Sequence, residues 1–186
     1  MDDDHIIDMF WEKNENAVYE TDRKYGAFLK QIANNILSSQ MDAEEILQDT
    51  YLSAWQKIPP ERPLHLKAYL GKIIRNLSLK KVRDMNTAKR GGGKIVQITE
   101  ELSDICEGYS SVSEIVETRE TAQVIDHFLR SLPIRECDVF VCRYWYCDSI
   151  SDISSRFNMG ESRVKMMLLR TRKKLAKYLE KGGICL

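Results

Sequence analysis

The stretch GESRVKMMLLRTRKKLAKYLEKGG, residues 160–183, decides the fold of the end of the chain. At 100° per residue it predicts a helix with Val164, Leu168 and Leu175 on one side. That apolar side is typical of a helix packed on a core. The opposite side combines Met166 with several basic residues, so it predicts a surface for a negatively charged partner that also offers apolar contacts. Its members are Lys165, Met166, Leu169, Arg170, Lys173 and Lys177.

A short helix and a tight turn precede this basic helix. Ser149 and Asp152 form an S-x-x-D capping pattern for a helix over ISDISSRF, residues 150–157. Asn158 tolerates the left-handed conformation, and Gly160 can cap the next helix. This order is the plan of a helix-turn-helix, whose second helix enters the major groove of DNA. The helical wheel favours DNA over a coiled-coil or protein partner for the basic side.

The net charge of zero hides four blocks of charge. Residues 1–50 carry net −8 and residues 95–126 carry net −7, whereas residues 72–94 and 163–181 each carry net +7. A solvated surface usually mixes the two signs. Two basic blocks separated by an acidic one therefore indicate two contact surfaces for a polyanion.

The other periodic segments are helical as well, so the sequence predicts an all-α chain. Apolar residues at three- and four-residue steps predict a helix around residues 12–37. Asp42 and Glu45 predict the start of a second helix that ends before Pro59, and a third runs from about residue 66 to 83. On the third helix an apolar stripe lies opposite a basic side formed by Lys72, Arg75, Asn76, Lys80 and Arg83.

Two small helical domains are predicted, joined by a flexible acidic linker. NTAKRGGGK, residues 86–94, is followed by scattered acids and serines with little helical drive. The linker is placed at residues 88–113, between domains at residues 1–87 and 114–186. Within the linker, KIVQI could form a short extended segment.

Composition and motifs argue against several classes of protein. The chain has no apolar run of membrane-spanning length, and MDDDHIIDMF lacks the start of a secretory signal, so a cytoplasmic protein is expected. The five cysteines form no CxxC pair and the histidines are isolated, so no metal site is expected. RGGGK lacks the spacing of a phosphate-binding loop, and no catalytic set is recognisable. We expect no enzyme, cofactor or small-molecule substrate, and Asp2, Asp3 and Asp4 are expected to be solvated.

Together, these stretches resemble the extracytoplasmic-function (ECF) type of bacterial sigma factor, in the sigma-70-like family. DAEEILQDTYLSAWQKI, residues 42–58, resembles the acidic-then-aromatic helix of region 2. LKAYLGKIIRNLSLKKVRD, residues 66–84, resembles the basic helix that follows it, particularly at Arg75 and Asn76. Residues 132–179 resemble region 4. The resemblance covers about two thirds of the chain, in the expected order.

The resemblance implies a role for each of these segments. In the family, region 2 binds the clamp helices of the largest subunit of RNA polymerase, and its basic helix with the preceding loop, here residues 58–65, captures and opens the minus-10 promoter element. Region 4 reads the minus-35 element. The implied polymerase-binding residues are Asp42, Glu44, Glu45, Gln48 and Asp49. The implied minus-10 residues are Lys72, Arg75, Asn76, Lys80 and Arg83, and the implied minus-35 residues are Arg163, Lys165, Met166, Leu169, Arg170, Lys173 and Lys177.

Two positions depart from the family pattern. A small polar residue is usual where Met166 stands, and a polar or aromatic residue is common where Leu169 stands. More apolar readout of the minus-35 element is expected, although Met166 could equally contact the polymerase flap. The acidic segment at residues 95–126 corresponds to a linker that threads toward the RNA exit path, and either RNA mimicry or a plain tether explains its charge.

The resemblance also implies the partners. They are core RNA polymerase, promoter DNA and an anti-sigma factor, which in many members is anchored in the membrane. Two alternatives remain from the residues themselves: a free-standing helix-turn-helix regulator, and an all-helical adaptor that binds acidic proteins.

Overall fold

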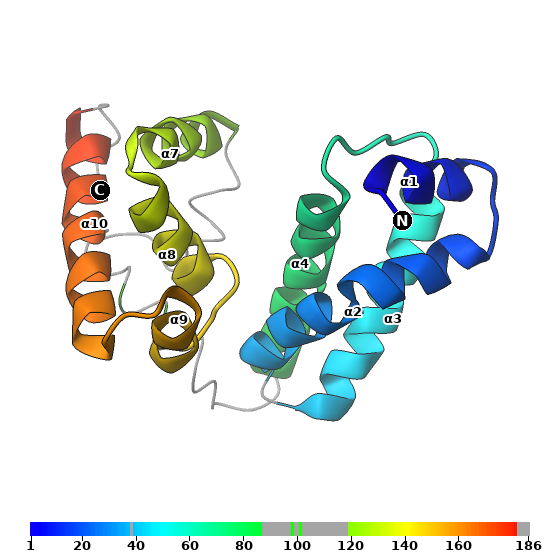
Figure 1. The fold of residues 1–186 in the computed structure, drawn as a ribbon, viewed down its shortest axis with the longest axis horizontal. Coiled ribbons are helices and arrows are strands. Elements are labelled where there is room, and N and C mark those ends of the chain that lie inside the picture. Colours follow the sequence, from blue (N-terminus) through cyan, green and yellow to red (C-terminus); the bar gives the residue numbers. More distant parts are fainter. Residues whose placement is uncertain (38, 87–97, 99–100, 102–118, 182–186) are drawn as a thin grey trace. The chain divides into compact units, whose positions relative to one another are not determined.

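The computed structural model confirms the all-α fold (Figure 1). Its described residues form eight α-helices and no β-strand. Within that part of the chain, no helix is both long and apolar enough to cross a membrane. The residues that the structure describes are 1–37, 39–86, 98, 101 and 119–181.

The chain divides into two compact units, Met1–Gly92 and Gly93–Leu186. Two units agree in number with the two predicted domains. The predicted boundaries, at residues 87–88 and 113–114, lie outside the described residues, so they stay a prediction.

The first unit is built on three long helices that pack against one another: α2 (Asn16–Leu37), α3 (Gln40–Lys57) and α4 (Leu66–Asn86). Helix α1 (Asp3–Trp11) lies on α2 (Figure 1). The apolar stripes predicted for α2, α3 and α4 meet in one core because each helix contacts both of the others. The core includes Ile6, Phe10, Leu29, Ile32, Ala54, Leu66, Leu70 and Ile74.

Helix α1 is missing from the sequence prediction, which began the first helix near residue 12. The Asp2 carboxylate caps α1 by accepting a hydrogen bond from the His5 backbone N–H at 3.0 Å, and Ile6 and Phe10 are fully buried. Lys13, at φ 55°, separates α1 from α2. A helix of nine residues has too few turns for a periodic pattern to stand out.

The expectation that the terminal aspartates are solvated is wrong for Asp3. Its carboxylate accepts hydrogen bonds from Lys24 Nζ at 2.6 Å and from the Tyr25 hydroxyl at 2.5 Å. Burial alone would raise the pKa of Asp3, but the hydrogen bonds from Lys24 and Tyr25 outweigh it and hold that pKa below its usual value. Asp3 therefore fastens the amino terminus to α2.

The start of α3 also differs from its prediction. Ser39, not Asp42, is the N-cap, and its hydroxyl accepts a hydrogen bond from the Asp42 backbone N–H at 3.3 Å. Asp42 then lies in the first turn, where a carboxylate is favourable beside the helix N-terminus. This shift places both Asp42 and Glu45 on the helix itself.

The second unit holds α7 (Arg119–Ser131), α8 (Ile134–Tyr144), α9 (Ile150–Phe157) and α10 (Glu161–Lys181). Helix α10 contacts the other three, and α8 also contacts α9. An aromatic cluster supports this packing, because the Phe128 ring lies 6.5 Å from that of Phe140 and 5.5 Å from that of Tyr178, between centroids. Other core residues are Val139, Ile153, Val164, Leu168, Leu175 and Leu179.

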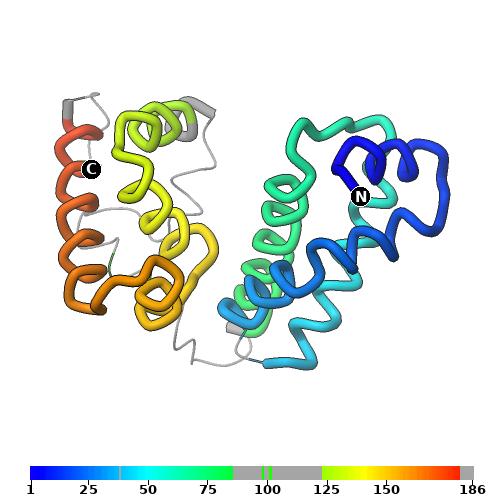
Figure 2. Tube along the Cα trace, viewed as in Figure 1, coloured from blue at the N-terminus to red at the C-terminus, as the bar shows by residue number. Residues whose placement is uncertain are grey.

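The predicted helix-turn-helix consists of α9, a tight turn and α10, and Figure 2 follows the chain through it. Ser149 and Asp152 form a complete capping box at the start of α9. Asn158 is left-handed, with φ 49°, and the Gly160 carbonyl accepts the first backbone hydrogen bonds of α10. The capping predictions for this motif are thus confirmed.

Candidate nucleic-acid interface

Helix α10 presents a basic, partly apolar face to solvent. Packing fixes its orientation, because Val164, Leu168 and Leu175 on the other side are buried. Met166 stays 48% exposed, a high value for a large apolar side chain, and Leu169 is half-buried. The other predicted residues are all exposed: Arg163, Lys165, Arg170, Lys173 and Lys177.

Two further basic residues of α10 bind acids within the second unit. Lys174 Nζ lies 2.7 Å from a Glu136 carboxylate oxygen, and Arg172 contacts Glu101 and Tyr144. The net charge of residues 163–181 therefore overstates the charge offered to a partner. What remains on the exposed face matches the predicted residue set.

Helix α4 carries the second basic face. Lys72, Asn76 and Lys80 recur every four residues, so they lie along one side of the helix, and all three are exposed. Arg83, near the end of the helix, is exposed as well. These four side chains can approach a phosphate backbone together.

Arg75 does not belong to this surface. Only 8% of it is exposed, and Gly71 and Ser78, one turn away on either side, are buried too. The prediction that Arg75 flanks an exposed basic face is therefore wrong. The buried side of α4 is wider than its apolar stripe because α2 and α3 both pack on it.

A cavity of about 390 Å³ opens beside the exposed side of α4. Its volume lies in the range of small-molecule sites. The lining mixes apolar atoms with an amide, two lysines and a carboxylate, and it includes Tyr69, whose pKa is raised by burial and by the nearby Glu61. The lining residues are Ser53, Lys57, Glu61, Tyr69, Lys72, Ile73, Asn76 and Leu77.

The loop that contributes Glu61 to this cavity is held by residues near the amino terminus. Lys13 Nζ donates to the carbonyl oxygens of Trp55 at 2.7 Å and Ile58 at 3.0 Å, and it lies 5.0 Å from the centroid of the Trp55 ring. Arg62, within the loop, pairs with Asp8 of α1 at 2.7 Å. The sequence did not point to these contacts because their partners lie 42 to 54 residues apart.

The residues predicted on the polar side of α3 differ in their contacts. Gln48, Asp49, Glu44 and Glu45 are exposed, and Glu44 pairs with Lys30 at 2.7 Å. Glu45 and the half-buried Asp42 both bind a residue of α4. All five predicted polymerase-binding residues lie on α3.

That α4 residue is Lys81, which the sequence did not single out. Its ammonium group lies 2.8 Å from an Asp42 oxygen and 2.6 Å from a Glu45 oxygen. The hydrogen bonds from Lys81 and from Ser39 lower the pKa of Asp42, and those to Asp42 and Glu45 raise the pKa of Lys81. Lys81 thus joins the acidic helix to the basic one.

Two family profiles match the chain. Sigma-70 region 2 matches residues 22–87, which include the loop, the cavity and α4. Sigma-70 region 4 matches residues 122–175, which include α9, the turn and the greater part of α10. No curated protein sequence gives a significant match. Helix α1 lies outside both matched segments.

Proposed function

Because the chain belongs to the sigma-70 family, whose regions 2 and 4 serve promoter recognition, we propose that it is an ECF-type sigma factor. It binds core RNA polymerase in the cytoplasm and directs it to the promoters of a specialised set of genes. The supporting observation is the pair of exposed basic helix faces, on α4 and α10, in two separate units. Nucleotide chemistry belongs to the polymerase, so this role needs no catalytic residue.

In this proposal α10 reads the minus-35 element. Exposed Arg170, Lys173 and Lys177 suit guanine edges and phosphates. The exposed thioether of Met166 and the half-buried Leu169 suit the methyl groups of thymine. A minus-35 element that contains thymine at the contacted steps is expected.

Helix α4 and its cavity serve the minus-10 element. Opening a duplex requires phosphate contacts that hold one strand and a site that accepts an unstacked base. Lys72, Lys80 and Arg83 supply the first requirement, and the cavity beside Asn76 supplies the second. The Asn76 amide can both donate and accept, so it can pair with a base edge.

The acidic helix α3 serves the polymerase. The exposed carboxylates of Glu44 and Asp49, with Gln48 between them, suit a basic surface on the clamp helices of the largest subunit. The predicted anti-sigma factor, with or without a membrane anchor, belongs to the same proposal. It would compete for these surfaces.

Run-off transcription tests the proposal directly. Purified core polymerase is incubated with genomic fragments, with and without this protein, and the variants Arg170→Ala and Asn76→Ala are run in parallel. Arg130→Ala, which removes a charge from the exposed surface of α7, is the matched control. New discrete start sites that need the protein and weaken in the two variants alone support the proposal. If the protein produces no new start site and does not bind core polymerase, the proposal is rejected in favour of a free-standing regulator or an adaptor.

A further inference from the structure

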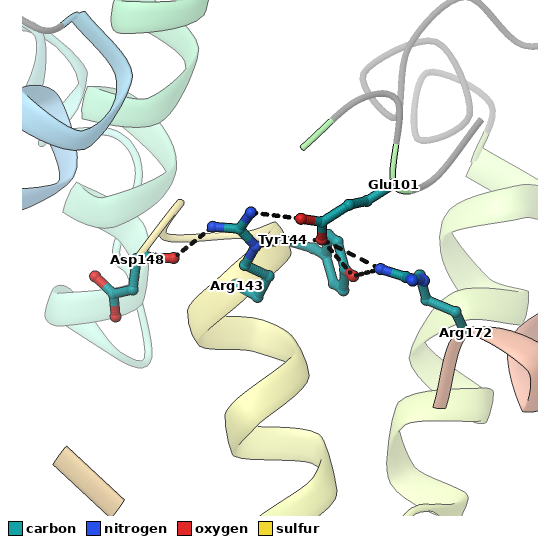
Figure 3. A network of polar contacts seen from close by, with 5 residues as sticks. All are labelled: Glu101, Arg143, Tyr144, Asp148 and Arg172. Atoms are coloured by element: carbon teal, nitrogen blue, oxygen red, sulfur yellow. Dashed lines mark hydrogen bonds and ion pairs between the residues drawn. The ribbon is translucent and has the colours of Figure 1, made fainter. Parts of the chain in front are cut away.

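A carboxylate from the acidic segment is bound by the second unit (Figure 3). Glu101 lies in the predicted linker, yet its Oε1 accepts a hydrogen bond from Arg143 Nη2 at 2.6 Å. Its Oε2 accepts three more, from Arg143 Nε at 3.3 Å, Arg172 Nη1 at 3.2 Å and the Tyr144 hydroxyl at 3.1 Å. Arg143 and Tyr144 belong to α8, and Arg172 belongs to α10.

This site fits one carboxylate closely. The side chains of Arg143 and Arg172 are only 7% and 16% exposed, and both guanidinium groups contact the Glu101 carboxylate. Without Glu101 the two cations would share a sparsely hydrated site with no carboxylate between them, which is unfavourable. Arg143 presents two nitrogens to the two oxygens in the bidentate geometry that guanidinium groups favour.

Tyr144 completes the site as a donor. Its hydroxyl accepts a hydrogen bond from Arg172 at 2.7 Å and donates to Glu101. Burial raises the pKa of Tyr144, which keeps the hydroxyl protonated and able to donate at neutral pH. A further contact, from Arg143 Nη1 to the Asp148 carbonyl at 3.0 Å, fixes the Arg143 side chain from the opposite side (Figure 3).

A buried apolar side chain lies three residues before Glu101. Ile98 is helical and 8% exposed, and Glu101 is helical as well. Ile98 is therefore a buried side chain of the acidic segment, in addition to the Glu101 carboxylate that α8 and α10 bind. The prediction that KIVQI is extended is wrong at Ile98, and its other residues lie outside the described part of the chain.

We propose that Glu101, together with the buried Ile98, anchors the acidic segment to α8 and α10 and so sets the length of chain between α4 and the anchored point. Helix α4 ends at Asn86, and Ile98 is twelve residues further on, so the connection spans at most about 43 Å. If the anchor is released, the connection extends to Arg119, the start of α7. The limit then rises to about 119 Å, nearly threefold. Beyond the proposed promoter contacts, the anchor limits how far apart the two units can be when they bind promoter DNA.

Insertions on either side of the anchor test this proposal in the full chain. One variant receives ten Gly/Ser residues between Gly91 and Gly92, before the anchor. The other receives the same ten residues between Ser110 and Ser111, after it. Fluorescent labels are introduced as non-natural amino acids at the exposed positions Met85 and Ile134, which leaves the cysteines unmodified.

Only the insertion before the anchor should increase the label-to-label distance. It lengthens the connection from twelve to 22 residues, which raises the root-mean-square span of that chain about 1.3-fold. In the Glu101→Gln background both insertions should increase the label-to-label distance. Glu100→Gln removes the same charge one position away and should leave the wild-type pattern intact. Equal responses to both insertions in the wild-type background, or no response to either, would overturn the proposal.

Hydrogen exchange provides a second measurement that needs no variant. The backbone amides at residues 98–101 should exchange at least about tenfold more slowly than the same segment in an unstructured peptide. Exchange at the unprotected rate in the intact chain would also overturn the anchor. Neither experiment contains polymerase or DNA, so failure of the anchor is distinguishable from failure of the proposed sigma activity.

Discussion

Helices α4 and α10 come from blocks with the same net charge, yet they present different surfaces. Helix α4 buries Arg75 and uses Lys81 to bind α3, and a cavity of about 390 Å³ opens beside its exposed residues. Helix α10 directs Arg172 and Lys174 to acids of its own unit and keeps Met166 exposed among its cations. Equal charge therefore does not mean equal function.

The difference lies in what accompanies the charge. A cavity with an amide at its edge suits a base that has left the duplex, because such a base needs a site that closes around it. Exposed apolar side chains among cations suit a closed duplex, since they can meet methyl groups in the major groove. Under the proposed function, these features suit strand opening by the first unit and duplex reading by the second.

The largest effect is expected at Arg170 of α10. Arg170→Ala should weaken binding to a minus-35 duplex by about 1–3 kcal/mol, because a guanidinium contact to a guanine edge is lost. Fluorescence anisotropy with matched and scrambled duplexes measures the effect. Equal weakening on both duplexes would identify Arg170 as a phosphate contact and remove it from sequence readout.

Asn76 tests the cavity of α4. Asn76→Ala should lower the yield of open complexes by roughly tenfold at most, the value of one hydrogen bond of about 1.5 kcal/mol. Binding to core polymerase should be unchanged. Permanganate footprinting of unpaired thymines measures opening, and gel filtration measures binding. An unaltered open-complex yield would separate the cavity from strand opening.

Lys13 tests whether the wall of that cavity depends on the amino terminus. Lys13→Met should lower the free energy of unfolding by about 1 kcal/mol, because the carbonyls of Trp55 and Ile58 lose a charged donor. Lys13→Arg is the control that retains a cation. Urea denaturation gives the stability, and a Met variant as stable as wild type would show that the loop holds its position unaided.

The smallest effect is expected at Lys81, whose ammonium group joins α4 to α3. Lys81→Met should cost about 0.5 kcal/mol of stability, since both ion pairs are partly exposed, and it should leave DNA affinity unchanged. The pKa of Asp42 is lowered in the folded state, so the bridge stabilises the protein above the usual carboxyl pKa of about 3.9.

The pH dependence of the melting temperature tests this prediction. The difference in melting temperature between wild type and Lys81→Met should stay constant from about pH 5 to 9 and shrink as the pH falls through the lowered pKa of Asp42. A difference that grows on acidification would contradict the assigned pairing. Loss of DNA affinity at neutral pH would instead add Lys81 to the residues of α4 that contact DNA.

Local patterns predicted what depends on neighbours in sequence. The capping box at Ser149, the left-handed turn at Asn158 and the exposed side of α10 follow from spacing and caps, and the structure confirms them. Arg75 could not be placed in this way, because its burial depends on how widely α2 and α3 cover α4. Glu101 was hidden for the same reason, since its partners lie 42 and 71 residues further along the chain.

That separation has a consequence for the order in which the protein is made. Domains generally fold amino-terminal first during synthesis, so the helices of the first unit can assemble before α10 has been translated. Glu101 leaves the ribosome well before Arg172 and lacks this partner until α10 exists. Until then only Arg143 and Tyr144 of α8 can bind Glu101, so the proposed anchor gains its full set of contacts once α10 has been translated.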